Sequence, residues 1–344
     1  MNTNDLRARV KQTVATQRLL EQAAIVVLMV SGGSDSVALA RLMPTLYPAN
    51  HFEVLHVNHQ LRADAADADE SFVQKLCAEL DLPCTIERIN VAALAKKRGE
   101  SLEQAGRAAR YERAEALLDE LCLAKGMLPQ QGRIATAHTM DDRAETYLMR
   151  VIVGGGSGSL ASIPYQRGRI IRPLLDCRKQ VLADWLRENF GASAWREDAS
   201  NADTAQARAF VRHDLLPLLA GRNPTIVETL ARSADVLTVE SAYLTAAAEE
   251  LLPLTSASFN APLALLRRAI YLAADAAFKE LAPGARITFE HIDLIAAKGA
   301  KPGFACHLPG GIEVRNSKGE LRFFAAKPPQ HDPRTNSEHT KTCN

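Results

Sequence analysis

The stretch VVLMVSGGSDSVALARL (residues 26–42) decides the fold of this chain. Residues 25–30 (IVVLMV) form an unbroken apolar, β-branched run, which is typical of a strand buried on both faces. Residues 35–46 then show helical spacing, although Pro44 should end that helix early. Six small residues, SGGSDS at 31–36, separate the two patterns, so the sequence predicts a tight strand-to-helix loop.

The same order of strand and helix repeats along the first half of the chain. The further strands and helices that we expect, in chain order, are 52–57, 66–81, 84–89, 104–125, 133–137 and 141–152. This alternation predicts an α/β fold with a doubly wound parallel sheet. Ligands bind beyond the carboxyl ends of the strands in such sheets, so the polar loops at 31–36, 57–62 and 137–142 should share one edge.

The pattern changes twice beyond the sheet. Apolar residues recur at helical spacing from about 208 to 298, and residues 304–326 resemble short strands joined by Gly-Gly and Lys-Gly turns. The last residues are rich in Pro, Thr, Asn and His. We therefore expect an α/β catalytic domain, a helical domain, a small β segment and a disordered tail at 1–215, 216–300, 301–326 and 327–344.

The loop at 31–36 has the chemistry of an anion site. Unpaired backbone N–H groups and the helix dipole meet at a helix N-terminus, and phosphates bind there. The predicted ligand-binding residues of this loop are Ser31, Gly32, Gly33, Ser34, Asp35 and Ser36. A carboxylate repels phosphate unless a cation lies between them, so Asp35 indicates Mg²⁺. The alternative is a tight turn with Asp35 as N-cap, since neither a Walker A motif nor G-x-G-x-x-G is present.

A second acidic group, Asp141, Asp142 and Glu145, begins the helix that follows the fourth strand. Asp142 and Glu145 are three residues apart and share a helix face. They could simply complement the helix dipole. However, the parallel sheet should bring them to the same edge as Asp35, and carboxylates on both sides of a phosphate loop predict a Mg–nucleotide site.

Basic residues and histidines near this edge allow two interpretations. Arg107, Arg110 and Arg113 repeat every three residues, so they form either a phosphate-contacting stripe or a solvated face. His56 and His59 point to opposite faces of a continuing strand, which suits a structural or nucleotide-contact role better than chelation.

Composition limits the class of protein. The 344 residues are 47% apolar and 24% charged with a net charge of +1, which is an ordinary globular balance that neither requires nor excludes nucleic acid. The six cysteines form no C-x-x-C pair, which excludes a zinc ribbon or a thioredoxin-type site. No run approaches the ~20 apolar residues of a membrane helix, and no signal-peptide core is seen, so we expect a cytoplasmic protein without membrane contact.

Several motifs together resemble a known family. SGGSDS is similar to the PP-loop signature of N-type ATP pyrophosphatases, which cleave ATP between the α and β phosphates. The motifs that follow it in order are HVNHQLR (56–62), EQAGRAARYE (103–112), AHTMDDRAET (137–146), IIRPLL (170–175) and WREDASNAD (195–203). Over about residues 24–220 this combination resembles the tRNA(Ile)-lysidine synthetase family.

The resemblance implies a ligase that uses ATP, Mg²⁺, L-lysine and the tRNA(Ile) whose anticodon is CAU. It implies that Asp35 and Asp142 hold Mg²⁺, and it makes Glu145 a candidate to position and deprotonate the lysine amine. It also places Arg107 and Arg110 at the active site. The backbone near Val57 would contact adenine. A homodimer is left open.

Four positions depart from the family pattern: Thr139, Arg143, Ala209 and the SLASI segment at 159–163. Because they put detailed roles in doubt, three other functions stay under consideration. They are a PP-loop tRNA thiolase, an amidotransferase-type synthetase, and a tRNA- or nucleotide-binding homologue without catalysis. The missing C-x-x-C pairs argue against the thiolase, and the missing glutaminase-like block argues against the amidotransferase.

Overall fold

A computed structural model describes residues 3–60, 63–196 and 206–325 of the chain. The chain forms two compact units, Met1–Leu237 and Thr238–Asn344, which are described separately. The predicted tail at 327–344, the loop residues 61–62 and the segment containing Asp198, Ser200, Asn201 and Asp203 lie outside the described residues.

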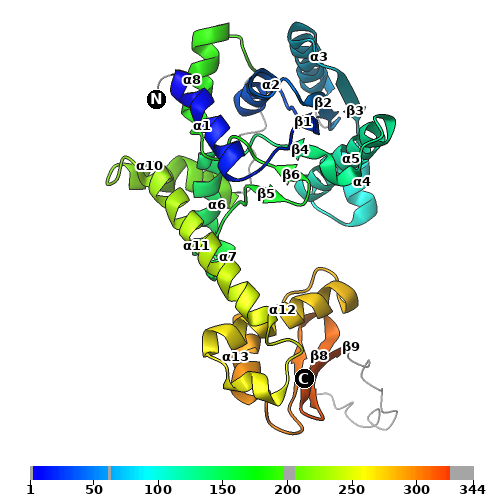
Figure 1. The fold of residues 1–344 in the computed structure, drawn as a ribbon, viewed down its shortest axis with the longest axis vertical. Coiled ribbons are helices and arrows are strands. Elements are labelled where there is room, and N and C mark those ends of the chain that lie inside the picture. Colours follow the sequence, from blue (N-terminus) through cyan, green and yellow to red (C-terminus); the bar gives the residue numbers. More distant parts are fainter. Residues whose placement is uncertain (1–2, 61–62, 197–205, 326–344) are drawn as a thin grey trace, which may run out of the picture. The chain divides into compact units, whose positions relative to one another are not determined.

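The first unit is built on a six-stranded sheet of order β3-β2-β1-β4-β6-β5 (Figure 1). Its strands are β1 (Ile25–Met29), β2 (His51–Asn58), β3 (Cys84–Arg88), β4 (Arg133–Ala135), β5 (Gln166–Arg167) and β6 (Ile170–Ile171). All neighbouring pairs are parallel except β5 with β6. The chain winds from β1 to one side and then to the other, so the predicted doubly wound fold is confirmed, with its switch point between β1 and β4.

The alternation of side chains along β1 explains its central position. Val26 and Leu28 contribute to the hydrophobic core on one face of the sheet, whereas Ile25 and Val27 contribute to the core on the other face. All four are at most 1% exposed. A strand buried on both faces needs an unbroken apolar run, and this is what residues 25–30 provide.

Helices cover both faces of the sheet. Those of the first unit are α1 (Thr3–Thr16), α2 (Ser34–Leu46), α3 (Ala63–Leu80), α4 (Val91–Arg98), α5 (Leu102–Ala124), α6 (Met140–Ile152), α7 (Ser157–Leu160) and α8 (Lys179–Phe190), with a 3₁₀ turn at Pro129–Gln131. The expectation that Pro44 ends α2 early was wrong, because the helix continues to Leu46. A proline removes only the bond that its own N–H would donate, and the helical pattern resumes after Pro44, where the N–H of Tyr47 donates to the Met43 carbonyl at 3.0 Å.

A run of short helical segments follows the sheet. Its parts are α9 (Gln206–Phe210), a π-helical turn (Val211–Leu215) and α10 (Leu216–Ala220), and α11 (Ile226–Glu249) comes next. Val227 and Ala231 of α11 pack with Met140 and Ala144 of α6 in a small apolar cluster. This cluster attaches the segment to the helix that follows β4.

The second unit has its own core. It contains the end of α11, a 3₁₀ turn at Ser256–Asn260, α12 (Leu263–Leu281), α13 (Phe289–Lys298), β7 (Ala305–Leu308), a 3₁₀ turn at Pro309–Gly311, β8 (Ile312–Ser317) and β9 (Glu320–Ala325). The three strands are antiparallel, as the turn signals predict, and Lys318 and Gly319 both have positive φ in the last turn. Helices and strands share one hydrophobic cluster, so the segments 216–300 and 301–326 do not form separate cores.

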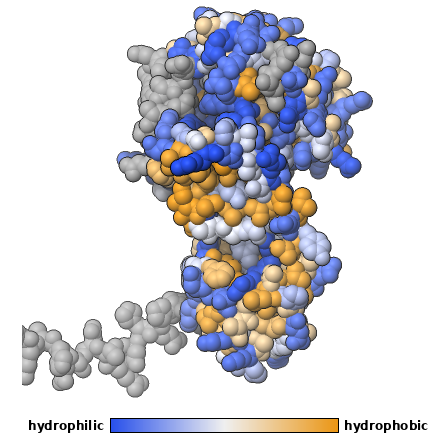
Figure 2. All heavy atoms as spheres, turned by 90° about the vertical axis from the view of Figure 1, so that its left-hand side faces the viewer, coloured by the Kyte–Doolittle hydropathy of each residue, from blue (hydrophilic) through white to orange (hydrophobic). Residues whose placement is uncertain are grey.

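The surface is mixed. Figure 2 shows a face on which hydrophilic residues predominate and apolar residues gather in a few patches. Among the described residues, no helix is long and apolar enough to cross a membrane.

Candidate active site

Four parallel strands of the first unit end at one edge of the sheet, which we call the carboxyl edge. The loop at 31–36 follows β1, Asn58 closes β2, the segment 136–139 follows β4, and Arg172 follows β6. The predicted site residues therefore come from loops that meet at this edge, as the fold requires.

The loop at 31–36 is closed by its own serine. The hydroxyl of Ser36 accepts hydrogen bonds from the backbone N–H groups of Ser31 (3.2 Å) and Gly32 (3.1 Å) and donates to the carbonyl of Gly33 (2.9 Å). Gly32 has a φ of +98°, a conformation that favours glycine. Ser36 thus fixes the loop shape, and the first N–H groups of α2 are left for an anion.

Asp35 does not cap its helix. The N-cap of α2 is Gly33, with no side-chain cap, so the alternative interpretation of Asp35 as a capping residue was wrong. Asp35 Oδ1 accepts a hydrogen bond from Ser34 (3.3 Å), and Oδ2 lies 3.5 Å from the ammonium of Lys179. Burial raises the pKa of Asp35 to about 6; Lys179 opposes this rise and the negative charge of Asp142 adds to it. The two predicted metal ligands are therefore close enough to repel each other.

Asp142 is held by a capping box. The backbone N–H and the hydroxyl of Thr139 both donate to Asp142 Oδ2 at 2.8 Å, and Arg208 donates to Oδ1 at 3.2 Å. Burial opposes ionisation, but His138, these bonds from Thr139 and the charge of Arg208 outweigh it, and the pKa of Asp142 lies below its ordinary value. Thr139, a departure from the family pattern, thus serves as the N-cap of α6.

The donors at Asp35 and Asp142 fit a magnesium ion that arrives with a nucleotide. Both are carboxylates, the hard oxygen ligands that Mg²⁺ prefers, and both stand beside the phosphate loop. The described residues contain no group of three or more His, Cys, Asp or Glu side chains arranged to hold a metal ion. Two carboxylates with substrate phosphates form an ordinary Mg²⁺ environment, whereas an all-protein cage is not needed.

Glu145 is buried between two arginines. It is 2% exposed, its Oε2 accepts from Arg208 Nε at 2.9 Å, and its Oε1 accepts from Arg212 Nε at 2.6 Å. The π-helical turn at 211–215 contains Arg212, and π turns are frequent at functional sites. Sequence reasoning missed Arg212, although the Arg-x-x-x-Arg spacing of 208–212 was the available signal.

Arg107 and Arg110, the two predicted site residues on α5, have different surroundings. Arg110 is half-buried beside His59, where burial and then the charge of Arg110 lower the pKa of His59 to about 4. Arg107 is exposed and lies over the ring of Tyr111, 5.2 Å from its centroid. These two arginines sit beside different partners, so they do not form a single solvated stripe.

His138, in the segment after β4, lies within the electrostatic influence of Arg107 and Arg172. Burial lowers the pKa of His138 to about 4, and the charges of Arg172 and Arg107 act in the same direction. Val57 lies in β2, half-buried, with its backbone paired to Glu87 of β3. The last residue of β2 that pairs with β1 is Leu55, opposite Met29. Val57 comes two residues later and therefore lies at the carboxyl edge.

A second basic group in the sequence, for which the sequence leaves either tRNA backbone contact or a solvated surface open, does not form one surface cluster: Arg167, Arg169, Arg172 and Arg178. Arg172 is 2% exposed and donates to the carbonyl of Pro164 at 2.7 Å, which excludes a solvated role. Arg169 forms ion pairs with Glu115 and Asp119 of α5. The glycine-rich stretch GGGSGSL (154–160), for which the sequence predicts a flexible loop, contains the short helix α7 in its second half. Just after α7, the carbonyl of Ser162 accepts a hydrogen bond from Arg150 of α6 at 2.9 Å.

Arg143, another departure, faces away from the site. It is 1% exposed and donates to the Tyr165 hydroxyl at 2.9 Å, to the Ala231 carbonyl at 3.3 Å and to Asp235 Oδ1 at 2.5 Å. Tyr165 and Ala231 belong to the β5 side of the sheet and to α11. Arg143 is therefore a structural residue of the first unit.

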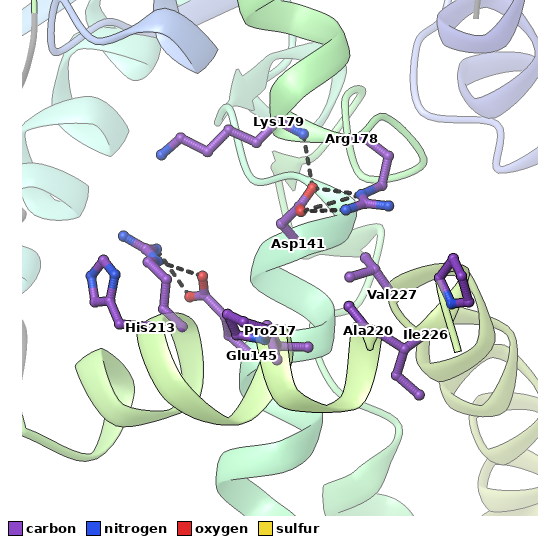
Figure 3. Close-up of a pocket in the computed structure, with 12 residues that line it drawn as sticks. Asp141, Glu145, Arg178, Lys179, His213, Pro217, Ala220, Ile226 and Val227 are labelled. Carbon is purple, nitrogen blue, oxygen red and sulfur yellow. Dashed lines mark hydrogen bonds and ion pairs between the residues drawn. The ribbon is translucent and has the colours of Figure 1, made fainter. Parts of the chain in front are cut away.

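A cavity of about 680 Å³ opens beside Glu145 (Figure 3). Charged residues form part of its wall: Asp141 accepts from Arg178 and from the backbone N–H of Lys179, and Arg178 also bonds Glu228 at 2.8 Å. The rest is apolar and consists of Leu216, Pro217, Ala220, Pro224, Ile226 and Val227. The cavity can hold a small molecule that has both charged groups and an aliphatic chain.

Comparison with known proteins identifies the family. The chain is similar to tRNA(Ile)-lysidine synthases of Geobacter sulfurreducens (37% identity, 87% of this chain and 64% of the relative), Deinococcus radiodurans (36%, 89% and 49%) and Thermus thermophilus (35%, 88% and 57%). It therefore spans about half to two-thirds of the length of these relatives.

A solved U34-tRNA thiolase of Methanococcus maripaludis shares the fold, with a TM-score of 0.54 and 20% identity over 68% of this chain and 78% of that one. A family model described as the PP-loop domain matches residues 2–219. The chain thus belongs to the PP-loop family.

Proposed function

We propose that this protein is a tRNA(Ile)-lysidine synthetase. In the proposed reaction ATP adenylates the C2 carbonyl oxygen of cytidine 34 in a CAU-anticodon tRNA(Ile), and pyrophosphate leaves. The ε-amine of L-lysine then attacks C2, loses a proton and displaces AMP. Lysidine pairs with A, so codon specificity changes from AUG to AUA. The tRNA substrate favours a cytoplasmic location, and the homodimer stays a prediction.

One observation carries the proposal. Asp35 and Asp142 stand in the first turns of α2 and α6, which follow different strands, and they influence each other electrostatically. Two carboxylates that repel each other beside the unpaired N–H groups of a helix start favour a site for a divalent cation together with phosphates. The loop has no Walker lysine, which fits a site that holds a departing pyrophosphate better than one for γ-phosphate transfer.

Asp35 and Asp142 are the residues that would hold Mg²⁺ in this proposal. The ion would neutralise the charge that develops on the leaving pyrophosphate. The chain itself supplies the N–H groups at the start of α2, and Arg107 and Arg110 on α5 are proposed to contact phosphate or tRNA.

The cavity beside Glu145 supports a place for lysine. Its apolar wall suits the four methylenes, and its charged wall contains the ion pair of Asp141 with Arg178, whose members would exchange partners with the ammonium and the carboxylate of lysine. Both oxygens of Glu145 accept from guanidinium groups. Because both of its oxygens are occupied by guanidinium groups, we propose that Glu145 orients Arg208 and Arg212 rather than removing the lysine proton.

The thiolase alternative has less support. The chain shares the fold with a thiolase solved with an iron–sulfur cluster, but that likeness extends to the fold alone. The described part of the chain has no grouped ligand set for such a cluster.

A single assay tests the proposed function. Purified protein with Mg-ATP and radiolabelled lysine should transfer label to a CAU-anticodon tRNA(Ile) transcript and release AMP. Elongator tRNA(Met) shares the anticodon and serves as the near-cognate control, which should accept little label. If tRNA(Ile) gains no lysine while ATP and Mg²⁺ are present, the proposed function is wrong.

A further inference from the structure

Lys179 joins two carboxylates of the carboxyl edge. Its backbone N–H donates to Asp141 Oδ2 at 2.8 Å, and its side-chain ammonium lies 3.5 Å from Asp35 Oδ2. The residue stands outside the motifs at 31–36 and 137–146, and the proposed reaction does not use it. The side chain of Lys179 is 43% exposed, compared with 19% for Asp35, so the ion pair lies at the surface end of this carboxylate's surroundings.

The helix does not explain a lysine at this position. Lys179 is the first residue of α8, Arg178 is the N-cap, and the first turn contains no acidic residue. A helix N-terminus carries partial positive charge, so a cation there is unfavourable for the helix. Lys179 therefore gains its stabilisation from Asp35, the carboxylate that it faces.

The ammonium stands where a divalent cation would need to bind. In the structure each proposed Mg²⁺ ligand faces a cation of the chain: Lys179 faces Asp35, and Arg208 faces Asp142. Two cations within contact distance of one carboxylate repel each other. An ion bound at Asp35 and the Lys179 ammonium must therefore compete.

We propose that Lys179 is a positioning residue that holds Asp35 while no divalent cation is bound and turns to the pyrophosphate when the nucleotide brings the cation. A lysine suits this exchange because its charge is compact and its stem is flexible. The N-terminus of α2, where phosphates are proposed to bind, begins next to Asp35, so the movement is short. The second half of this inference rests on the proposed function, since it assumes pyrophosphate release at this loop.

The competition can be measured without any reaction. Mn²⁺ is titrated into the full chain without nucleotide, and free Mn²⁺ is followed by electron paramagnetic resonance. Lys179→Met keeps the length of the side chain but removes its charge. It should bind Mn²⁺ about fivefold more tightly, the factor for a partly exposed ion pair. Pyrophosphate binding in the presence of Mn²⁺ should weaken about tenfold, because a charge-assisted contact is lost.

Three further variants separate charge from packing. Lys75→Met removes an exposed lysine of α3 and should change neither affinity. Lys179→Arg keeps the charge and should bind Mn²⁺ as the wild type does. Lys179→Gln is a second uncharged variant, in case Lys179→Met does not fold.

The two halves of the inference fail separately. Unchanged or weaker Mn²⁺ binding by the uncharged variants would overturn the competition, and unchanged pyrophosphate binding would overturn the exchange. Neither titration uses tRNA or lysine. A wild type that transfers no lysine would therefore refute the proposed function and leave the Mn²⁺ result readable.

Discussion

Two consecutive residues of α6, Asp142 and Arg143, bury charge in opposite ways. Arg143 is 1% exposed and donates to three groups of the surrounding structure, a hydroxyl, a carbonyl and a carboxylate. Asp142 is held by Thr139 and by Arg208, and its charge disfavours the ionisation of Asp35. The terminal nitrogens of Arg143 are bonded by the fold, whereas Asp142 lies near a second carboxylate whose charge a ligand could neutralise.

This difference offers a criterion for telling a structural charge from a functional one. A buried charge that is fully paired makes its removal costly for folding. A carboxylate placed near another carboxylate reduces stability, and such an arrangement is typical of a binding or catalytic site. Burial by itself does not separate the two faces of α6, but the sign of the neighbouring charge does: Arg143 faces the carboxylate of Asp235, whereas Asp142 faces a second carboxylate, Asp35.

The largest expected effect is on catalysis at Asp142. Asp142→Asn should lower lysine transfer about 10³-fold, because the proposed Mg²⁺ loses a charged ligand. The amide oxygen can still accept from Thr139, so the urea midpoint should change little. Asp184→Asn, at an exposed carboxylate paired with Arg187 on α8, is the matched control. Equal AMP formation by Asp142→Asn and wild type would contradict the assignment.

On the opposite face the expected effect is on stability. Arg143→Gln removes the guanidinium and should lower the free energy of unfolding by about 3 kcal/mol, because Asp235 and Tyr165 lose a charged partner. Urea denaturation measures this, with the exposed Arg187→Gln as control. Transfer per folded molecule should stay within a few-fold. A large loss of transfer at unchanged stability would mean that Arg143 belongs to the active face.

Glu145 should show an intermediate effect. Glu145→Gln keeps the shape but loses the charge that orients Arg208 and Arg212, so lysine transfer should fall about 30-fold, equivalent to about 2 kcal/mol. Steady-state kinetics with varied lysine and varied pH test this role. If Glu145 were instead the base, the wild-type acidic limb of the rate profile would disappear in the variant, and this outcome would refute the orienting role.

The smallest expected effect is a pH-dependent loss of folding stability that Asp35 causes. Its pKa is raised by burial from 3.8 to about 6 in the folded chain, so the folded state binds more protons between these values. Stability therefore falls as pH rises through about 4 to 6. In metal-free buffer with chelator, Asp35→Asn should be about 1–2 kcal/mol more stable than wild type at pH 8 and equal at pH 4. Identical pH profiles would show that Asp35 carries no such cost.

The sequence predicts the sheet well because its signals are local. The apolar run at 25–30 and the Gly-rich turns of residues 304–326 determine structure within a few residues of themselves. Parallel topology then brings Asp35 and Asp142 to one edge, so these two could be paired without coordinates. The extent of α2 past Pro44 depends on a few hydrogen bonds at its last turn, which periodicity does not reveal.

The partners of these carboxylates are less predictable. Lys179 meets Asp35, and Arg212 meets Glu145, only after α8 packs beside α2 and the 206–220 segment packs beside α6. Such contacts depend on tertiary packing over long separations in sequence. The boundary between the two compact units is also hard to predict from the sequence. It falls between Leu237 and Thr238, inside the continuous helix α11, where no change of composition marks it.

The π-helical turn at Val211–Leu215 has a consequence for insertions and deletions. A π turn contains more residues than an α turn over the same path, so this segment holds surplus chain length. Deleting one residue within it would remove this surplus and let a regular helix run from α9 into α10. Arg212, which lies inside the π turn, would then change its position relative to Glu145, whereas Arg208 in α9 would keep its own. The length of this segment, as much as its residue types, is therefore under constraint.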